Sequence, residues 1–165
     1  MTGSAPDERQ LSQAIIVDRD ARRALLVYHK SGRWKGFYTG LLDEAAPGEA
    51  PATAAARIAQ SHVGITPGSL SHRATFIFSS EAWGRAREFE FLAEAHSGEA
   101  VESDTFRPEW FDLASMPYGQ MPADDEIWYP LFLDGKKMRG HFDFAPDGQT
   151  LIAHEIEEVK PGETP

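Results

Sequence analysis

Two adjacent carboxyl groups, Asp124 and Asp125, stand just before an apolar run of seven residues, 127–133. Two carboxyls enclosed in an apolar pocket do not both ionise at low cost, so one tends to keep its proton. A protonated carboxyl beside an ionised one offers a hydrogen-bond donor next to an acceptor. The plainer interpretation, which the residues alone favour, is a helix start in which Asp124 is the N-cap and the second carboxylate lies at the positive end of the helix dipole.

A second stretch, "GEAPATAAARIAQSHVGI" (residues 48–65), has the spacing of a catalytic helix without its chemistry. Arg57 follows Glu49 by eight residues, and Gly64 closes the segment. A metal-using enzyme would place several carboxylates between Arg57 and Gly64, because Mg²⁺ prefers oxygen ligands in octahedral geometry. Three other residues occupy those positions: Ile58, Ser61 and His62. None of the three is a good Mg²⁺ ligand, so we expect no metal at this helix.

A relocated metal site is the alternative. The nearby groups that could supply it are Asp43, Glu44, Glu49, His62, Glu102 and Asp104. A site that contains His62 would prefer Mn²⁺ or Zn²⁺. No three of these groups have metal-like spacing, so we favour solvated loop charges and a surface His62 near a helix C-terminus. We therefore expect no cofactor, and Mg²⁺ or Mn²⁺ only if a relocated site exists.

Composition limits the function classes. The chain has 165 residues, no cysteine and a net charge of −10. The missing cysteines rule out disulfides, thiolate metal sites and cysteine nucleophiles. The negative charge disfavours binding to a nucleic-acid polymer. No apolar run approaches the roughly 20 residues of a membrane span, and no signal peptide is visible. We expect a cytoplasmic protein that binds a small molecule rather than a nucleic-acid polymer or a membrane; its oligomeric state is unknown.

Hydrophobic patterning predicts the elements that position these residues. Two β-favouring runs, residues 14–17 and 24–28, flank the turn-forming "DRDA" and indicate a hairpin. The alanine-rich residues 51–63 end at Gly64, which is typical of a helix with a glycine stop. Further strands are expected at residues 75–78, 87–95, 107–113, 138–144 and 150–159.

A second helix is expected over residues 124–133, with a kink or early break at Pro130. The strand at residues 87–95 alternates phenylalanine with Glu88 and Glu90, as a half-buried strand does. The order of elements indicates an α+β fold, with a mixed β-sheet packed between α-helices. We expect one domain at residues 11–160, a disordered N-terminal tail at 1–10 and a C-terminal tail at 161–165.

Five segments follow one another along the chain: "GRWKGF", the Glu49/Arg57/Gly64 frame, "VESDTFRPEWFDL", "MPADDEIWYPLFLDGKK" and "GHFDF". Together they resemble the Nudix superfamily, and more narrowly its MutT-like oxidised-purine nucleoside triphosphatases, which hydrolyse 8-oxo-dGTP and 2-hydroxy-dATP. The resemblance covers most of the chain, and residues 101–137 are its most specific part. It implies a Nudix fold.

The Nudix box reads Gly, five residues, Glu, seven residues, Arg-Glu, aliphatic, any, Glu-Glu, any, Gly, aliphatic. Glu49, Arg57 and Gly64 fall on this pattern, and the family uses such a Glu–Arg pair to brace a loop against the helix. Asp43 stands where the opening glycine belongs, and all three glutamates after the arginine are replaced. Thr105 replaces an acidic residue that assists the metal. The resemblance thus implies a degenerate box, in which the structural residues remain and the catalytic ones are unknown.

The resemblance also implies a base pocket. In this branch, paired carboxylates such as Asp124 and Asp125 read the purine edge, which reverses the preference for a simple N-cap. Lys35 stands where an asparagine usually hydrogen-bonds the base, and lysine has donors but no acceptor. Phe76 and Phe78 stand where the family places ring-stacking residues, although alternate phenylalanines in a strand are more often core. The expected ligand-binding residues are Asp124, Asp125, Lys35, Phe76, Phe78 and Tyr28.

We predict a pseudoenzyme that binds a purine-like nucleotide or other small ligand without the usual metal-dependent diphosphate hydrolysis. One alternative is an active hydrolase of nucleoside triphosphates or diphosphate-linked substrates with a relocated metal site. Another is a metal-free catalyst that uses Asp124, Asp125 or His62 as acid and base. A protein-interaction module that keeps only the fold is a further alternative, and the acid pair argues against it.

Overall fold

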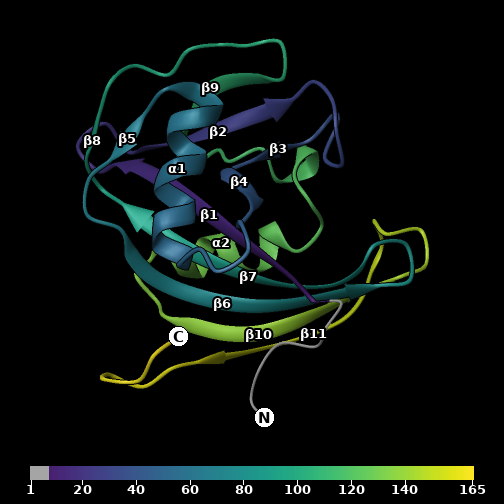
Figure 1. Ribbon diagram of the computed structural model, residues 1–165. Coiled ribbons are helices and arrows are strands. Elements are labelled where there is room, and N and C mark those ends of the chain that lie inside the picture. Colours follow the sequence, from purple (N-terminus) through teal and green to yellow (C-terminus); the bar gives the residue numbers. More distant parts are fainter. Residues whose placement is uncertain (1–7) are drawn as a thin grey trace.

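A long mixed β-sheet with a helix on either side forms the described part of the chain, residues 8–165, in the computed structural model (Figure 1). The strands are β1 (Arg9–Asp18), β2 (Arg23–His29), β3 (Tyr38–Thr39), β4 (Leu41–Glu44), β5 (Thr66–Pro67), β6 (Ser71–Ser80), β7 (Gly84–Ala93), β8 (His96–Ser97), β9 (Phe106–Asp112), β10 (Met138–Phe144) and β11 (Leu151–Glu158). The helices are α1 (Pro51–Val63) and α2 (Asp125–Leu133), with a 3₁₀ turn at Tyr118–Gln120.

The strand order of the main sheet is β11-β10-β6-β7-β1-β2-β3, with β4 paired to β1 and β9 paired to β2. Two pairs are parallel, β1 with β7 and β6 with β10, and the other pairs are antiparallel. Strands β5 and β8 form a small separate sheet. The predicted first hairpin is β1–β2, and the predicted closing hairpin is β10–β11.

Both faces of the sheet are covered, because apolar residues occupy consecutive positions of the central strands. In β1, Leu11 and Ile15 join the core cluster that contains Trp128 of α2. Ala14 and Ile16 point to the opposite face and join the cluster that contains Ile58 of α1. Side chains of a strand alternate between faces, so the two helices lie on opposite sides of the sheet. The expected α+β arrangement, a mixed sheet between helices, is confirmed.

Helix α1 has the predicted bounds. Pro51 is its first residue, where a missing N–H costs little. Gly64 follows with φ of 78° and donates its N–H to the Gln60 carbonyl at 2.9 Å. A left-handed residue that closes the last turn in this way is the usual role of a C-terminal glycine.

Helix α2 has nearly the predicted bounds but differs from expectation in its capping and at Pro130. Asp124 is the N-cap residue, as the residues alone suggested, but its side chain makes no capping hydrogen bond. Pro130 lies inside the helix, which continues to Leu133 instead of breaking early. Neither helix of the described chain is long and apolar enough to cross a membrane.

The predicted tail boundaries need correction. Strand β1 already begins at Arg9, and Glu8 forms ion pairs at 2.8 Å with two arginines of β7. Residues 8–10 therefore belong to the domain, while residues 1–7 lie outside the described part. At the other end, Glu163 pairs with Arg139 at 2.7 Å, and the Pro165 carbonyl accepts a hydrogen bond from β6. The last residues are therefore held against the sheet.

Candidate functional site

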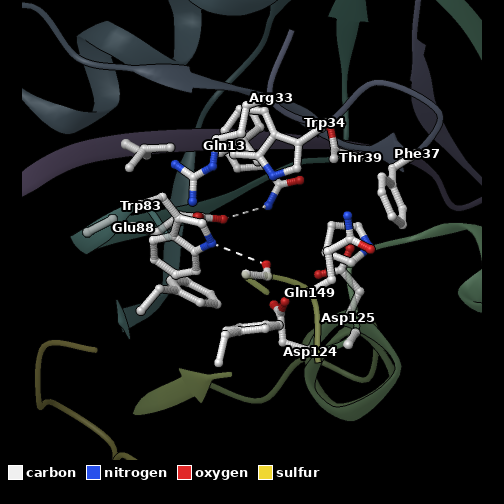
Figure 2. A pocket seen from close by; sticks show the side chains of 18 of the residues that line it. Gln13, Arg33, Trp34, Phe37, Thr39, Trp83, Glu88, Asp124, Asp125 and Gln149 are labelled. Carbon is white, nitrogen blue, oxygen red and sulfur yellow. Dashed lines mark hydrogen bonds between the residues drawn. The ribbon is translucent and has the colours of Figure 1, made fainter. Parts of the chain in front are cut away.

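A cavity of about 210 Å³ opens between β1, β7, the β2–β3 loop and the start of α2 (Figure 2). Its most buried polar lining residues come from four distant segments: Gln13, Thr39, Glu88, and the pair Asp124 and Asp125. Its outer rim is formed by Arg33, Trp34, Trp83 and Gln149. Aliphatic and aromatic side chains complete the wall, among them Leu11, Leu42, Phe78 and Phe144. The cavity is thus a pocket of mixed polar and apolar lining with a carboxyl-rich floor.

The acid pair lies at this floor. Asp124 and Asp125 are each 4% exposed, and the Trp128 indole N–H donates to Asp124 Oδ2 at 2.8 Å. Burial raises the pKa of both carboxyls, and the pKa of Asp125 is raised further by the charge of Asp124. Asp125 therefore keeps its proton most readily. The pair offers a ligand a protonated carboxyl beside a hydrogen-bond acceptor.

Two further buried carboxyls, Glu88 and Glu90, were not predicted as site residues. Gln13 Nε2 donates to Glu90 Oε2 at 2.7 Å and to Glu88 Oε1 at 3.3 Å. Gln13 Oε1 accepts from the Gly40 N–H at 2.7 Å and from the Tyr129 hydroxyl at 3.1 Å. Since a backbone N–H only donates, these contacts fix the orientation of the Gln13 amide.

The surroundings of both glutamates raise the pKa of their carboxyls. Burial raises the pKa of Glu88 to about 7, and the pKa of Glu90 is raised well above its usual range by burial and by its neighbour Glu88. Glu88 lines the cavity, whereas Glu90 lies behind it. The alternating pattern of residues 87–95 predicted that these two glutamates lie on one face of the strand. In the structure that face is covered by other side chains and is not exposed to solvent. The unusual signal in the sequence was Gln13, a lone amide at the start of an apolar run.

The rim carries a stacked cation. The Arg33 guanidinium lies 4.8 Å from the centre of the Trp34 ring and 4.5 Å from that of Trp83. The Trp83 indole N–H donates to the Gly148 carbonyl at 3.1 Å, which holds the ring at the cavity edge. Figure 2 shows Arg33 on the side of the cavity opposite Asp124 and Asp125.

Three of the six expected ligand-binding residues line the cavity: Asp124, Asp125 and Phe78. The other three do not. Lys35 is exposed on the β2–β3 loop. Phe76 is fully buried and packs against Trp128, with ring centres 5.2 Å apart. Tyr28 packs edge-on against Tyr38 and under the Arg107 guanidinium. Lys35, Phe76 and Tyr28 therefore do not line the cavity.

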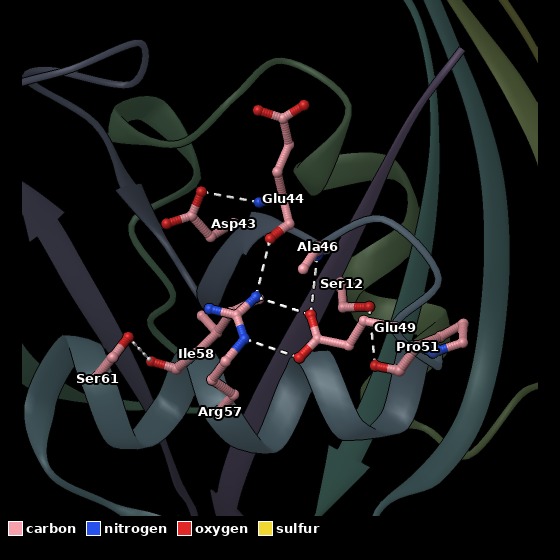
Figure 3. A network of polar contacts seen from close by, with 9 residues as sticks. All are labelled: Ser12, Asp43, Glu44, Ala46, Glu49, Pro51, Arg57, Ile58 and Ser61. Atoms are coloured by element: carbon pink, nitrogen blue, oxygen red, sulfur yellow. Dashed lines mark hydrogen bonds and ion pairs between the residues drawn. The ribbon is translucent and has the colours of Figure 1, made fainter. Parts of the chain in front are cut away.

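A second polar network surrounds α1 (Figure 3). The Arg57 guanidinium donates to both Glu49 oxygens, at 2.8 and 2.9 Å, and to the Glu44 carbonyl at 3.1 Å. Glu49 Oε1 also accepts from the Ala46 N–H at 2.9 Å. These hydrogen bonds, mainly those from Arg57, lower the pKa of Glu49 to about 2. The pair therefore ties the β4–α1 loop to the helix.

The sequence matches the NUDIX domain family over residues 8–132. The chain belongs to the Nudix family. An oxidized purine nucleoside triphosphate hydrolase from Danio rerio is 33% identical over 141 residues, which cover 84% of this chain and 88% of that protein. The protein of the same description from Mus musculus is 34% identical over 132 residues, or 78% of this chain and 80% of that protein.

Solved structures agree on the fold. The MutT protein from Bacillus halodurans has a TM-score of 0.78 to this chain at 21% identity, covering 90% of this chain and 97% of its own. A MutT Nudix hydrolase from Burkholderia pseudomallei has a TM-score of 0.61 at 24% identity, covering 67% of this chain and 87% of its own. The predicted Nudix fold is therefore confirmed.

The three Nudix-box positions after Arg57 have other packing roles in this chain. Ile58 is fully buried in the cluster between α1 and the sheet. Ser61 Oγ lies 3.4 Å from the Ile58 carbonyl. The His62 side chain is 6% exposed, stacks on Phe106 with ring centres 3.9 Å apart, and hydrogen-bonds Asp43 at 2.9 Å. The expectation of a surface His62 was therefore wrong.

The donor set around α1 does not suit Mg²⁺. Both Glu49 oxygens are engaged by Arg57, Asp43 is engaged by His62, and Glu102 pairs with Lys30. Among the residues that the structure describes, no three His, Asp or Glu side chains come together as a metal-binding group. Magnesium needs several carboxylate or phosphate oxygens, so these residues do not fit the metal that the Nudix box usually holds.

Proposed function

We propose that this Nudix protein binds a purine-like nucleotide or other small planar ligand in the cavity, without the usual metal-dependent diphosphate hydrolysis. The observation that carries the proposal is a contrast between two places. At the box, Ile58 belongs to the core and His62 is bonded to Asp43. At the cavity, Asp124 and Asp125 remain buried and line a space of about 210 Å³.

The cavity residues have clear tasks in binding. A protonated Asp125 donates a hydrogen bond to a ring nitrogen or carbonyl, and its neighbour Asp124 accepts one from an N–H group. Phe78 and the rim indoles supply the aromatic contact that a flat ring prefers. Polar groups inside an apolar pocket fix the orientation of the ligand.

A single panel tests this proposal. The protein at high concentration is given oxidised and normal nucleoside triphosphates with Mg²⁺, Mn²⁺ or chelator, and phosphate and pyrophosphate release are measured beside the thermal midpoint. We expect a rise in the midpoint with ligand and no metal-dependent release. Asp125→Asn should reduce the ligand-induced rise, whereas Glu126→Gln, an exposed neighbour on the same helix, should leave it unchanged.

A metal-dependent hydrolase is the second candidate, because the relatives at 33% and 34% identity are described as hydrolases of oxidised purine nucleoside triphosphates. It predicts release that chelator abolishes, and that result would overturn the proposal. Release that chelator does not affect would instead indicate metal-free catalysis by the cavity carboxyls.

A further inference from the structure

The charge balance of the cavity is unusual. Glu88, Asp124 and Asp125 line it, Glu90 backs it, and Arg33 at the rim is the only basic side chain of the lining. A buried carboxylate is costly without a partner, and a desolvated cation compensates it best. Planar N–H donors also match carboxylate oxygens two at a time. The floor therefore suits a flat ligand that is positively charged and rich in N–H donors.

The rim already holds a group of this chemistry. The Arg33 guanidinium is a planar cation, and it lies 4.8 Å from the Trp34 ring centre and 4.5 Å from the Trp83 ring centre. A cation within about 6 Å of an indole face is attracted by the ring quadrupole. Burial of the guanidinium lowers the pKa of Arg33, but the residue as a whole is exposed, so its long side chain has room to move outward. The space between the indoles is thus suited to a planar cation from solution.

Size and surroundings disfavour a polyphosphate. The cavity of about 210 Å³ is smaller than the roughly 300–1,000 Å³ of common ligand pockets. It encloses one ring system, so the sugar and phosphates of a nucleotide would lie outside it. Strand β4 leads from Leu42 in the cavity wall to the exposed carboxylates of Asp43 and Glu44. A phosphate chain that followed this strand would meet like charges, and residues 8–165 hold no metal-binding group to offset them.

Building on the proposed binding function of this cavity, we infer that its ligand is a planar cation without a phosphate chain, such as a positively charged purine base or an aryl amidine. The ring enters between Trp34 and Trp83 and displaces the Arg33 guanidinium. Its N–H groups donate to Glu88, and a ring system long enough to span the cavity also reaches the acid pair on the opposite side. Arg33 acts as an internal competitor for the same aromatic gap.

Two matched pairs of compounds test the charge directly: 7-methylguanosine against guanosine, and benzamidine against benzamide. Each pair has nearly the same shape, and at pH 6, where 7-methylguanosine keeps its N1 proton, only the first member is cationic. Titration calorimetry on the full chain should give at least tenfold tighter binding of each cation. GTP without metal should bind more weakly than guanosine.

Variants test the residues. Glu88→Gln keeps an oxygen for the Gln13 amide and should weaken cation binding about tenfold. Arg33→Ala should strengthen it several-fold, because the competing guanidinium is removed. Lys35→Ala, on the same loop but outside the cavity lining, should change nothing. Thermal unfolding of each variant checks that the fold is intact. The comparison of cationic with neutral compounds is made on the wild-type protein, so it does not depend on any variant folding.

The outcomes separate this inference from the function on which it rests. Equal affinity for cation and neutral partner would overturn the inference and leave the binding function standing. Weaker binding in Arg33→Ala would also overturn it, because it would indicate an anion at the rim. If no nucleoside, nucleotide or aryl compound of the panel binds, the proposed function itself fails.

Discussion

Restoring a Nudix-box glutamate at position 58 should strongly destabilise this protein rather than create an enzyme. Ile58 is 0% exposed and packs against Ala14, Leu25 and Phe91 of the sheet in one apolar cluster. Ile58→Glu would place a carboxyl among the apolar side chains of this cluster.

The size of the effect follows from three contributions. Losing the buried isoleucine side chain costs about 2 kcal/mol. Enclosing a neutral carboxyl without a partner costs roughly another 1–3 kcal/mol. At pH 7, protonating a glutamate of ordinary pKa, about 4.3, costs about 3.7 kcal/mol more. The total of about 7–9 kcal/mol is as large as the whole stability of a typical domain.

Urea unfolding followed by tryptophan fluorescence at pH 7 and pH 5 measures this. The protonation cost falls by about 2.7 kcal/mol between these pH values, so Ile58→Glu should recover that much relative to wild type. Ile58→Gln buries an amide without charge and should show no such recovery. Ser61→Glu, exposed on the same helix, should stay within about 0.5 kcal/mol of wild type. An Ile58→Glu protein as stable as Ile58→Gln at pH 7, or stabilised by Mg²⁺, would refute this reasoning.

Other predictions concern single groups. Burial raises the pKa of Glu88 from 4.5 to about 7, so the folded state holds more protons and stability should fall as pH rises through this window; Glu88→Gln should flatten that part of a thermal-midpoint profile from pH 4 to 8. The charged groups that face Glu88 are Glu90, Asp124 and Arg33. The pKa of Glu49 is lowered to about 2, so the Glu49–Arg57 pair stabilises above pH 4.5 and its contribution is lost as pH falls toward 2. In a double-mutant cycle, Glu49→Gln and Arg57→Ala should be less than additive at pH 7, and additivity would mean that the brace contributes nothing. Gly64→Ala should lower the free energy of unfolding in urea by roughly 1–2 kcal/mol, because alanine is strained at a φ of 78°. No atom crowds the new methyl group, so the backbone strain is the whole effect, and an unchanged midpoint would contradict it.

Local patterns predicted most of the fold. The helix at residues 51–63 was found with its true bounds because alanine propensity and a C-terminal glycine are both local signals. The β1–β2 and β10–β11 hairpins followed from short apolar runs around turn residues. The starts and ends of strands were less well placed, and β1 took in residues expected in a tail.

The site was predicted less completely, because it depends on what covers each face. The alternating pattern predicted that Glu88 and Glu90 lie on one side of β7. That side is enclosed because α2, which comes later in the chain, packs over it. Phe76 and Phe78 share a face, yet Phe78 reaches the cavity while Phe76 lies against Trp128. The depth of a side chain along a strand depends on tertiary packing, so the sequence pattern alone did not separate the two phenylalanines.

The parallel pairing of β1 with β7 has a kinetic consequence. Gln13 and Glu88 meet across 75 residues of chain, and Gln13 meets Tyr129 across 116. Contacts this distant require long loops to close first, and such topologies fold slowly. The carboxyl floor is therefore absent until β7 and α2 have both docked on β1. A ligand of the cavity stabilises only chains that have completed this step, so during refolding ligand binding would report the last stage of assembly rather than the first.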